Sequence, residues 1–187
     1  MRIGAPAADS PAAHILLRSI GVVMESRFRH GFFDPVRILK AAGIRPGQEV
    51  LEVGCGTGFF TIPAAKLAGD GGCIYALDPQ RLAIEQVAGK VRDARLTNVR
   101  PIRSDATEAG LVTDSMDLIL LFGLIPSPTL PLDRLLPEIY RVLRSKGTLA
   151  VWTALPWWSP APVTKSGLFV YAGRRSGIHS FRKATEL

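Results

Sequence analysis

Leu51-Glu52-Val53-Gly54-Cys55-Gly56-Thr57-Gly58 is the stretch that decides how this chain of 187 residues folds. The short apolar run over 49–53 predicts a strand, and three glycines follow it at once. Glycines at a turn from strand to helix let a ligand approach the backbone closely, because they carry no side chain. The stretch therefore predicts a ligand-binding loop at the end of a parallel strand.

The spacing of the glycines indicates which ligand the loop suits. A dinucleotide-binding fingerprint requires G-x-G-x-x-G, whereas the third glycine here comes one residue early, at Gly58. A phosphate loop requires G-x-x-x-x-G-K-[ST], and the chain contains no such string. No Lys or Arg stands beside the loop, and an acid, Glu52, precedes the first glycine by two residues. Such a loop suits a cationic ligand better than a pyrophosphate.

Two further acids follow the next two strands of the pattern. Asp78 comes directly after a predicted strand over 73–77, where an acid can accept hydrogen bonds from ribose hydroxyls. Asp105 lies just after a predicted strand over 98–102. Each acid alone is explained as well by a turn or an N-cap. Together with the glycine loop, the three acids predict a binding site at the carboxyl edge of a sheet.

The rest of the chain alternates strands with helices, which is typical of a doubly wound parallel α/β sheet with right-handed crossovers. Further strands are predicted over 116–122 and 148–153, and helices over 11–26, 35–43, 60–68, 79–92 and 131–143. Residues 145–147 read as a turn, and three prolines over 156–162 predict a loop instead of a helix. Segments 167–171 and 178–183 flank a predicted turn over 172–177, so the chain should end in an antiparallel hairpin.

Composition excludes several classes of protein. The length fits one domain, and 47% hydrophobic residues exclude a disordered chain. No apolar run reaches the roughly 18 residues that cross a bilayer, so no membrane span is predicted. Two cysteines, Cys55 and Cys73, cannot build a disulfide framework or a four-ligand zinc site, and no metal is expected.

The net charge of +7 is spread along the chain without a dense basic run. Scattered charge mostly decorates solvated faces, although it also suits an anionic substrate, a nucleic acid or a membrane surface. The N-terminal stretch lacks the basic start and continuous apolar segment of a signal peptide. We therefore expect a cytoplasmic protein.

With these motifs in place, the sequence resembles the class I S-adenosylmethionine-dependent methyltransferases, in particular the broad ubiquinone/menaquinone methylase group. The resemblance spans 34–183 and rests on the glycine loop, Asp78, Ser104-Asp105-Ala106 and the stretch 135–151. Within that stretch, Ser145 and Lys146 replace a Pro and a Gly of the family's R-x-L-K-P-G-G turn. The resemblance implies a seven-stranded Rossmann-like methyltransferase sheet in the order 3-2-1-4-5-7-6. Residues 34–187 would form the cofactor-binding domain, and residues 1–33 a tail and helix that cover cofactor and substrate.

The resemblance also implies a role for each matched residue. Glu52 would orient the methionyl ammonium, Asp78 would bind the ribose diol, and Asp105 would bind the adenine amino group. The glycines would let the backbone pack on the ligand, and the end of the fourth strand would flank the methyl group. The predicted cofactor-binding residues are Glu52, Gly54, Cys55, Gly56, Thr57, Gly58, Asp78, Pro79, Asp105, Ala106, Phe122 and Gly123.

The acceptor is predicted to meet the loop over 123–132, which contains no Asp, Glu, His or Cys. Transfer of a methyl group from a sulfonium needs alignment more than a catalytic acid, because the leaving thioether is neutral. His30, before the first strand of the sheet, is a weak candidate for a base. The motifs by which nucleic-acid amino and cytosine methylases act are absent from this loop.

The sequence is therefore interpreted as an S-adenosylmethionine-dependent enzyme that methylates a small molecule. An RNA or protein methyltransferase and a non-catalytic S-adenosylmethionine-binding regulator remain as alternatives. A nucleic-acid partner is not expected, and a homodimer is left open.

Overall fold

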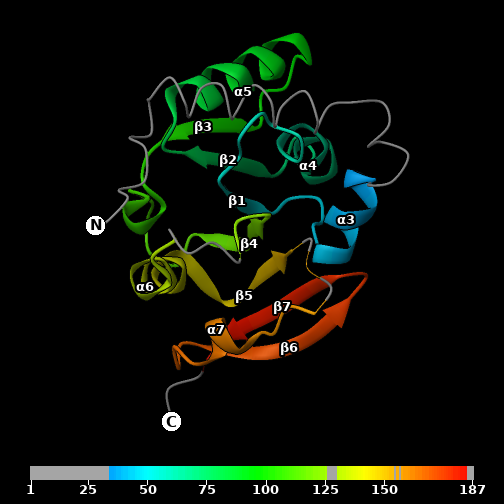
Figure 1. The fold of residues 1–187 in the computed structure, drawn as a ribbon. Coiled ribbons are helices and arrows are strands. Elements are labelled where there is room, and N and C mark those ends of the chain that lie inside the picture. The colour runs from blue at the N-terminus through cyan, green and yellow to red at the C-terminus, as the bar shows by residue number, and fades with distance from the viewer. Residues whose placement is uncertain (1–33, 126–129, 154, 156, 185–187) are drawn as a thin grey trace.

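The computed structural model describes residues 34–125, 130–153, 155 and 157–184. A seven-stranded sheet in the order β3-β2-β1-β4-β5-β7-β6 forms its centre, which confirms the predicted order (Figure 1). Strands β1 to β5 run parallel, and β7 and β6 are antiparallel additions at one edge. The strands are β1 Glu49–Val53, β2 Cys73–Asp78, β3 Val99–Arg103, β4 Met116–Phe122, β5 Leu143–Trp152, β6 Phe169–Arg175 and β7 Ile178–Lys183.

Helices cover both faces of the sheet. One core joins α3, α4 and α5 to one face, and a second core joins α6 and α7 to the other. The helices are α3 Pro35–Ala42, α4 Thr61–Ala68, α5 Arg81–Asp93, α6 Leu132–Val142 and α7 Ala161–Thr164, with a 3-10 turn η1 at Ala106–Glu108. Among the described residues, no helix is long and apolar enough to cross a membrane.

The central strand β4 shows why its sequence is apolar almost throughout. Leu118 and Leu120 point into the core shared with α4, whereas Ile119 and Leu121 point into the core shared with α6. All four side chains are at most 1% exposed, because helices cover this strand on both sides. The strand begins and ends at the predicted residues, Met116 and Phe122.

The fifth strand begins earlier than predicted. Helix α6 ends at Val142, and Leu143 already has extended backbone and pairs with Met116. The pairing resumes only at Thr148, so residues 144–147, which include the predicted turn, bulge from the strand. A side chain at Gly147 would meet the Leu143 side chain at 2.6 Å, which explains the glycine at this bulge.

The C-terminal hairpin forms as predicted, but its turn is shorter. Strand β6 continues to Arg175, and its register shifts between Tyr171 and Gly173. The turn consists of Ser176 and Gly177, which both have positive φ, as a two-residue hairpin turn requires. The proline-rich stretch before it also differs from the predicted loop, because Ala161–Thr164 forms one turn of helix. Pro162 fits there, since the first turn of a helix needs no donor from it.

Candidate functional site

A cavity of about 380 Å³ opens at the carboxyl ends of β1 and β2. The cavity is closed on its other sides by the loop after β3, the segment after β4 and the start of α6. Its lining residues are Val53, Gly54, Leu77, Asp78, Pro79, Gln80, Asp105, Ala106, Thr107, Leu124, Leu130, Pro131 and Leu135. Five of the predicted binding residues therefore meet in one cavity: Gly54, Asp78, Pro79, Asp105 and Ala106.

Asp78 links the glycine loop to the end of β2 through hydrogen bonds. Its Oδ2 accepts a hydrogen bond from the Gly56 amide at 3.0 Å, and its Oδ1 accepts one from the Gln80 amide at 2.9 Å. The amides of the loop's first two residues both donate to the Leu77 carbonyl. Asp78 is 6% exposed, and burial raises the pKa of its carboxyl. Each oxygen keeps a second lone pair that can accept from a ligand hydroxyl.

The three glycines of the loop all have positive φ, but their surroundings differ. A Cβ at Gly54 would lie 2.9 Å from Leu124 Cδ1, and one at Gly58 would lie 3.2 Å from Val87 Cγ2. A Cβ at Gly56 would meet no atom within 4 Å. Gly54 and Gly58 thus serve close packing within the protein, while Gly56 borders open space.

Glu52 lies outside the cavity lining and is buried beneath the glycine loop. Its Oε2 accepts a hydrogen bond from Thr61 Oγ1 at 2.5 Å, at the start of α4. Burial raises the pKa of Glu52 to about 8; the charge of Asp78 adds to this effect, and the Thr61 hydrogen bond opposes it. The carboxyl is therefore mostly protonated at neutral pH, and a nearby cation would favour its ionised form.

This buried carboxyl makes a testable prediction about stability. Because its pKa is raised in the folded protein, Glu52 binds a proton that the unfolded chain releases near the ordinary value of 4.5. The free energy of unfolding should therefore fall as pH rises from about 4.5 to about 8, by on the order of a few kcal/mol. Thermal melts across this range should show the fall, and Glu52→Gln should remove most of it. If the free energy of unfolding falls equally with pH in the unchanged protein and in the Glu52→Gln variant, the raised pKa of Glu52 is contradicted.

Asp105 stands at the mouth of the cavity and is exposed. Its Oδ1 accepts hydrogen bonds from both the amide and the hydroxyl of Thr107, each at 2.8 Å. These bonds cap η1 and hold the pKa of Asp105 below its ordinary value, so the carboxylate is ionised at neutral pH. Among the described residues Oδ2 has no hydrogen-bond partner and is available to a ligand.

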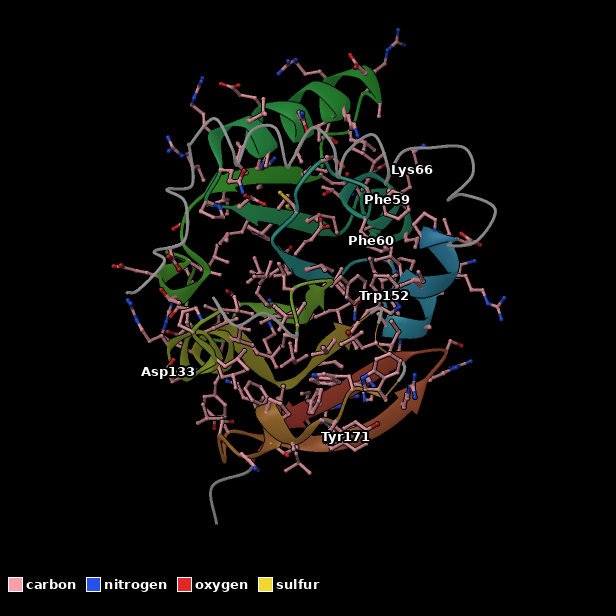
Figure 2. The ribbon with its side chains drawn as sticks, in the orientation of Figure 1. Phe59, Phe60, Lys66, Asp133, Trp152 and Tyr171 are labelled. Carbon is pink, nitrogen blue, oxygen red and sulfur yellow. The ribbon has the colours of Figure 1, made fainter. Side chains whose placement is uncertain are left out.

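The predicted residues at the end of β4 belong to an aromatic cluster on the α4 face of the sheet. The Phe60 ring lies 5.0 Å from Phe122, 6.1 Å from Trp152 and 4.9 Å from Phe59 between ring centroids. Figure 2 shows Phe59, Phe60 and Trp152 close together between α4 and the end of β5. The amide of Gly123 donates to the Trp152 carbonyl at 2.9 Å, so the two strand ends are joined here.

The remaining predicted residues of the loop are buried inside the fold. Cys55 and Thr57 are 5% and 7% exposed. Burial raises the pKa of the Cys55 thiol, which is therefore neutral. His30 lies outside the described residues. His179 is a packing residue: it is buried against Trp158 and hydrogen-bonded to the Tyr171 hydroxyl at 3.1 Å.

Sequence reasoning missed several residues of the site. Gln80 lines the cavity, and its buried Oε1 has no hydrogen-bond partner among the described residues, so it can accept from a ligand. Its position two residues after Asp78 was a signal that could have found it. Leu124 and Leu130 form apolar walls within the loop predicted to meet the acceptor. Nothing in the sequence pairs Thr61 with Glu52, because their contact depends on how α4 packs against β1.

The fold and the cavity define a class of protein: a doubly wound methyltransferase-type sheet whose glycine loop and acids meet at its carboxyl edge. The chain belongs to the methyltransferase domain family, whose model matches residues 50–147. Demethylmenaquinone methyltransferase from Staphylococcus aureus is 34% identical over 112 residues, which are 59% of this chain and 45% of that protein. The match thus spans less than half the length of this curated relative.

Solved structures agree with this assignment. A SAM-dependent methyltransferase from Aquifex aeolicus superposes with a TM-score of 0.77 at 25% identity, over 89% of this chain and 97% of that one. The PH0226 protein from Pyrococcus horikoshii, 16% identical, shares the fold with a TM-score of 0.71 over 86% and 93% of the two chains. S-adenosylmethionine is the cofactor that the family and the Aquifex structure identify.

The residues of the cavity fit this cofactor. Two carboxylates and no Lys or Arg stand among the described residues that line it, which suits a cationic sulfonium ligand without phosphates. Gly56 is not itself a lining residue, but it borders open space and its amide donates to Asp78, which lines the cavity; Gln80 Oε1, without a partner among the described residues, offers a further acceptor.

Proposed function

We propose that the protein transfers the methyl group of S-adenosylmethionine to a small, flat aromatic acceptor. The observation that carries the proposal is the single cavity, free of Lys and Arg among its described lining residues, in which Gly54, Asp78 and Asp105 meet. In this proposal Asp78 binds the ribose hydroxyls and Asp105 the adenine amino group. Glu52 faces the methionyl ammonium from beneath the loop. The cofactor, when bound, supplies an electrophilic methyl group on sulfur.

The aromatic cluster supports the choice of acceptor. Phe60, Phe122 and Trp152 stand at the carboxyl ends of β4 and β5, beside Gly123. A flat acceptor can stack against such rings, which also exclude water from the reacting atoms. The name of the Staphylococcus aureus relative, a demethylmenaquinone methyltransferase, agrees with an acceptor that carries an aromatic ring system.

The described residues of this cluster offer no acid or base, so in our proposal they align the acceptor and exclude water. An acceptor with an acidic ring hydroxyl fits this site, because its own ionisation makes it nucleophilic without a protein base. The chain then has to hold the acceptor in line with the methyl carbon, which is the task we assign to Phe60 and Trp152.

Methyl transfer from labelled S-adenosylmethionine tests this function directly. Reduced 1,4-naphthoquinones should be methylated, whereas total RNA stripped of modification and a mixture of unmodified proteins should gain no label. Label at a defined nucleotide or side chain would overturn the small-molecule proposal. Binding of S-adenosylmethionine without transfer to any of the three acceptor classes would favour a regulator.

A variant of the aromatic cluster tests the acceptor site. Phe60→Leu should raise KM for the naphthoquinol several-fold, roughly the contribution of one aromatic stacking pair, with an unchanged Kd for S-adenosylmethionine. Phe169→Leu is the matched control, because Phe169 is equally buried but packs on Tyr140 across the sheet. The control should lose stability without a change in KM. Equal effects of both variants on KM would show that Phe60 acts only through core packing.

A further inference from the structure

Two adjoining depressions follow helix α3 on the face of the sheet that it shares with α4. One, of about 430 Å³, lies between the end of α3, the β5 bulge and β7; the other, of about 410 Å³, lies between the start of α3 and the hairpin turn. Ala41 lines both, so we treat them as one surface and call it the α3 groove. It lies apart from the cofactor cavity and shares no lining residue with it.

The α3 groove concentrates positive charge. Seven cations line it: Arg37, Lys40, Arg45, Arg144, Lys146, Arg175 and Arg182. Only two carboxylates, Asp34 and Asp117, accompany them, and both are engaged. Asp34 caps α3 by accepting from the Val36 amide, and Asp117 pairs with Arg144 and accepts from the Glu49 amide. Seven of the chain's 23 Lys and Arg residues, which look scattered along the sequence, are therefore gathered on one surface.

Most of these cations are available to a ligand. Arg37, Lys40, Arg45, Lys146 and Arg175 make no ion pair within the described part of the chain. Arg182 is held in place, because its Nη1 donates to the carbonyls of residues 146 and 147 at 2.7 and 3.1 Å. The bulge in β5 that presents Lys146 is also where the sequence departs from the family's turn.

Exposed apolar side chains accompany the cations. Among the described residues five large apolar side chains are exposed, and two of them lie on this face: Val36 lines the groove, and Val170 on β6 pairs with Arg182. Two others, Tyr171 and Trp157, lie at the same edge of the sheet but on the face that α7 covers. Figure 1 shows α3 beside the β6–β7 end of the sheet, away from β3 and α5. None of the described residues that line the groove is aromatic, whereas sites for single-stranded nucleic acids stack bases on aromatic rings. Cations next to exposed apolar side chains suit a lipid surface better.

We propose that the α3 groove and the adjoining edge of β6 dock onto the phosphate headgroups of an anionic lipid bilayer. The groove also leads toward the acceptor site, since a Cβ at Gly177, next to Ser176, would lie 3.8 Å from Trp152 Nε1. Docking here places the aromatic cluster near the bilayer, from which a lipid-soluble acceptor enters. This last step rests on the proposed function, whereas the docking itself does not.

Vesicle flotation of the full chain tests the docking. The protein should float with vesicles of phosphatidylcholine and phosphatidylglycerol at low salt. It should remain in the bottom fraction when the vesicles contain phosphatidylcholine alone, or when the mixed vesicles are tested at high salt. Arg37→Glu with Lys40→Glu should weaken this binding at least about tenfold. The matched control, Arg92→Glu with Arg95→Glu, makes the same change of charge at the end of α5, near the opposite edge of the sheet. It should weaken vesicle binding less than about twofold. Both double variants should methylate a water-soluble naphthoquinol at the same rate as the unchanged protein.

Four outcomes would overturn the docking: equal binding to neutral vesicles, equal losses in both double variants, displacement by free glycerol phosphate, and displacement by RNA that persists at high salt. Glycerol phosphate would indicate a small-ligand site, and RNA a nucleic-acid site. If vesicles bind as expected but no naphthoquinol is methylated, the docking stands and the proposed function fails. If the naphthoquinol is methylated but vesicles do not bind, the proposed function stands and the docking fails.

Discussion

Gly56→Ala should reduce affinity for S-adenosylmethionine by about a hundredfold or more and leave the protein folded. Gly56 has a φ of +52°, and a Cβ there would meet no atom of the described residues within 4 Å. The added methyl group would instead occupy the space that the proposed ligand fills against the loop. A hundredfold loss corresponds to about 3 kcal/mol, which one displaced close contact and its neighbours can supply. Titration calorimetry on the purified variant measures the loss.

The backbone strain of this substitution can be separated from its effect on the ligand. Gly110 also has a positive φ, of +69°, and also faces open space, but it follows η1 and lies outside the glycine loop, whereas the Gly56 amide donates to Asp78 of the cavity lining. Gly110→Ala should therefore cost the same stability, roughly 1–2 kcal/mol for a side chain in left-handed backbone, with unchanged affinity. If the two variants lose equal affinity, the loop does not contact the ligand at Gly56.

Much of the fold could be predicted from local signals. The apolar run of β4 and the strand before the glycine loop have the predicted bounds, because burial on both faces leaves a continuous apolar signature. Helix α3 has the Asp34 cap and the left-handed Gly43 that its sequence indicates. The positions of Asp78 at the end of β2 and of Asp105 after β3 were equally readable, since the carboxyl edge of a parallel sheet gathers such residues.

The features that escaped prediction depend on contacts between distant residues. Strand β5 starts at Leu143 because that residue pairs with Met116, which no local pattern records. Phe60 and Trp152 meet only when α4 packs across the ends of β4 and β5. The cations of the α3 groove come from α3 and the segment after it, and from β5, β6 and β7, so along the sequence they look scattered.

Asp78→Ala should lower affinity for S-adenosylmethionine at least about tenfold and also lower the Tm of the unbound protein. In our proposal the change removes hydrogen bonds from ribose hydroxyls to a carboxylate, each contributing roughly 1.5–3 kcal/mol. It also deprives the Gly56 and Gln80 amides of their acceptor, and a part-buried donor without a partner costs about 1–3 kcal/mol. The structure thus predicts a loss of stability together with the loss of affinity.

A ligand without the ribose hydroxyls distinguishes direct binding from loop support. If Asp78 accepts from the diol, Asp78→Ala should cost the 2′,3′-dideoxy analogue of S-adenosylmethionine far less affinity than it costs the natural cofactor. Asp34→Ala is the matched control, because Asp34 also accepts from the amide two residues ahead but lies outside the cavity lining. The control should lose stability and bind both ligands unchanged. An equal penalty of Asp78→Ala for both ligands would show that Asp78 only holds Gly56 and Gln80 in place, and that another group binds the ribose.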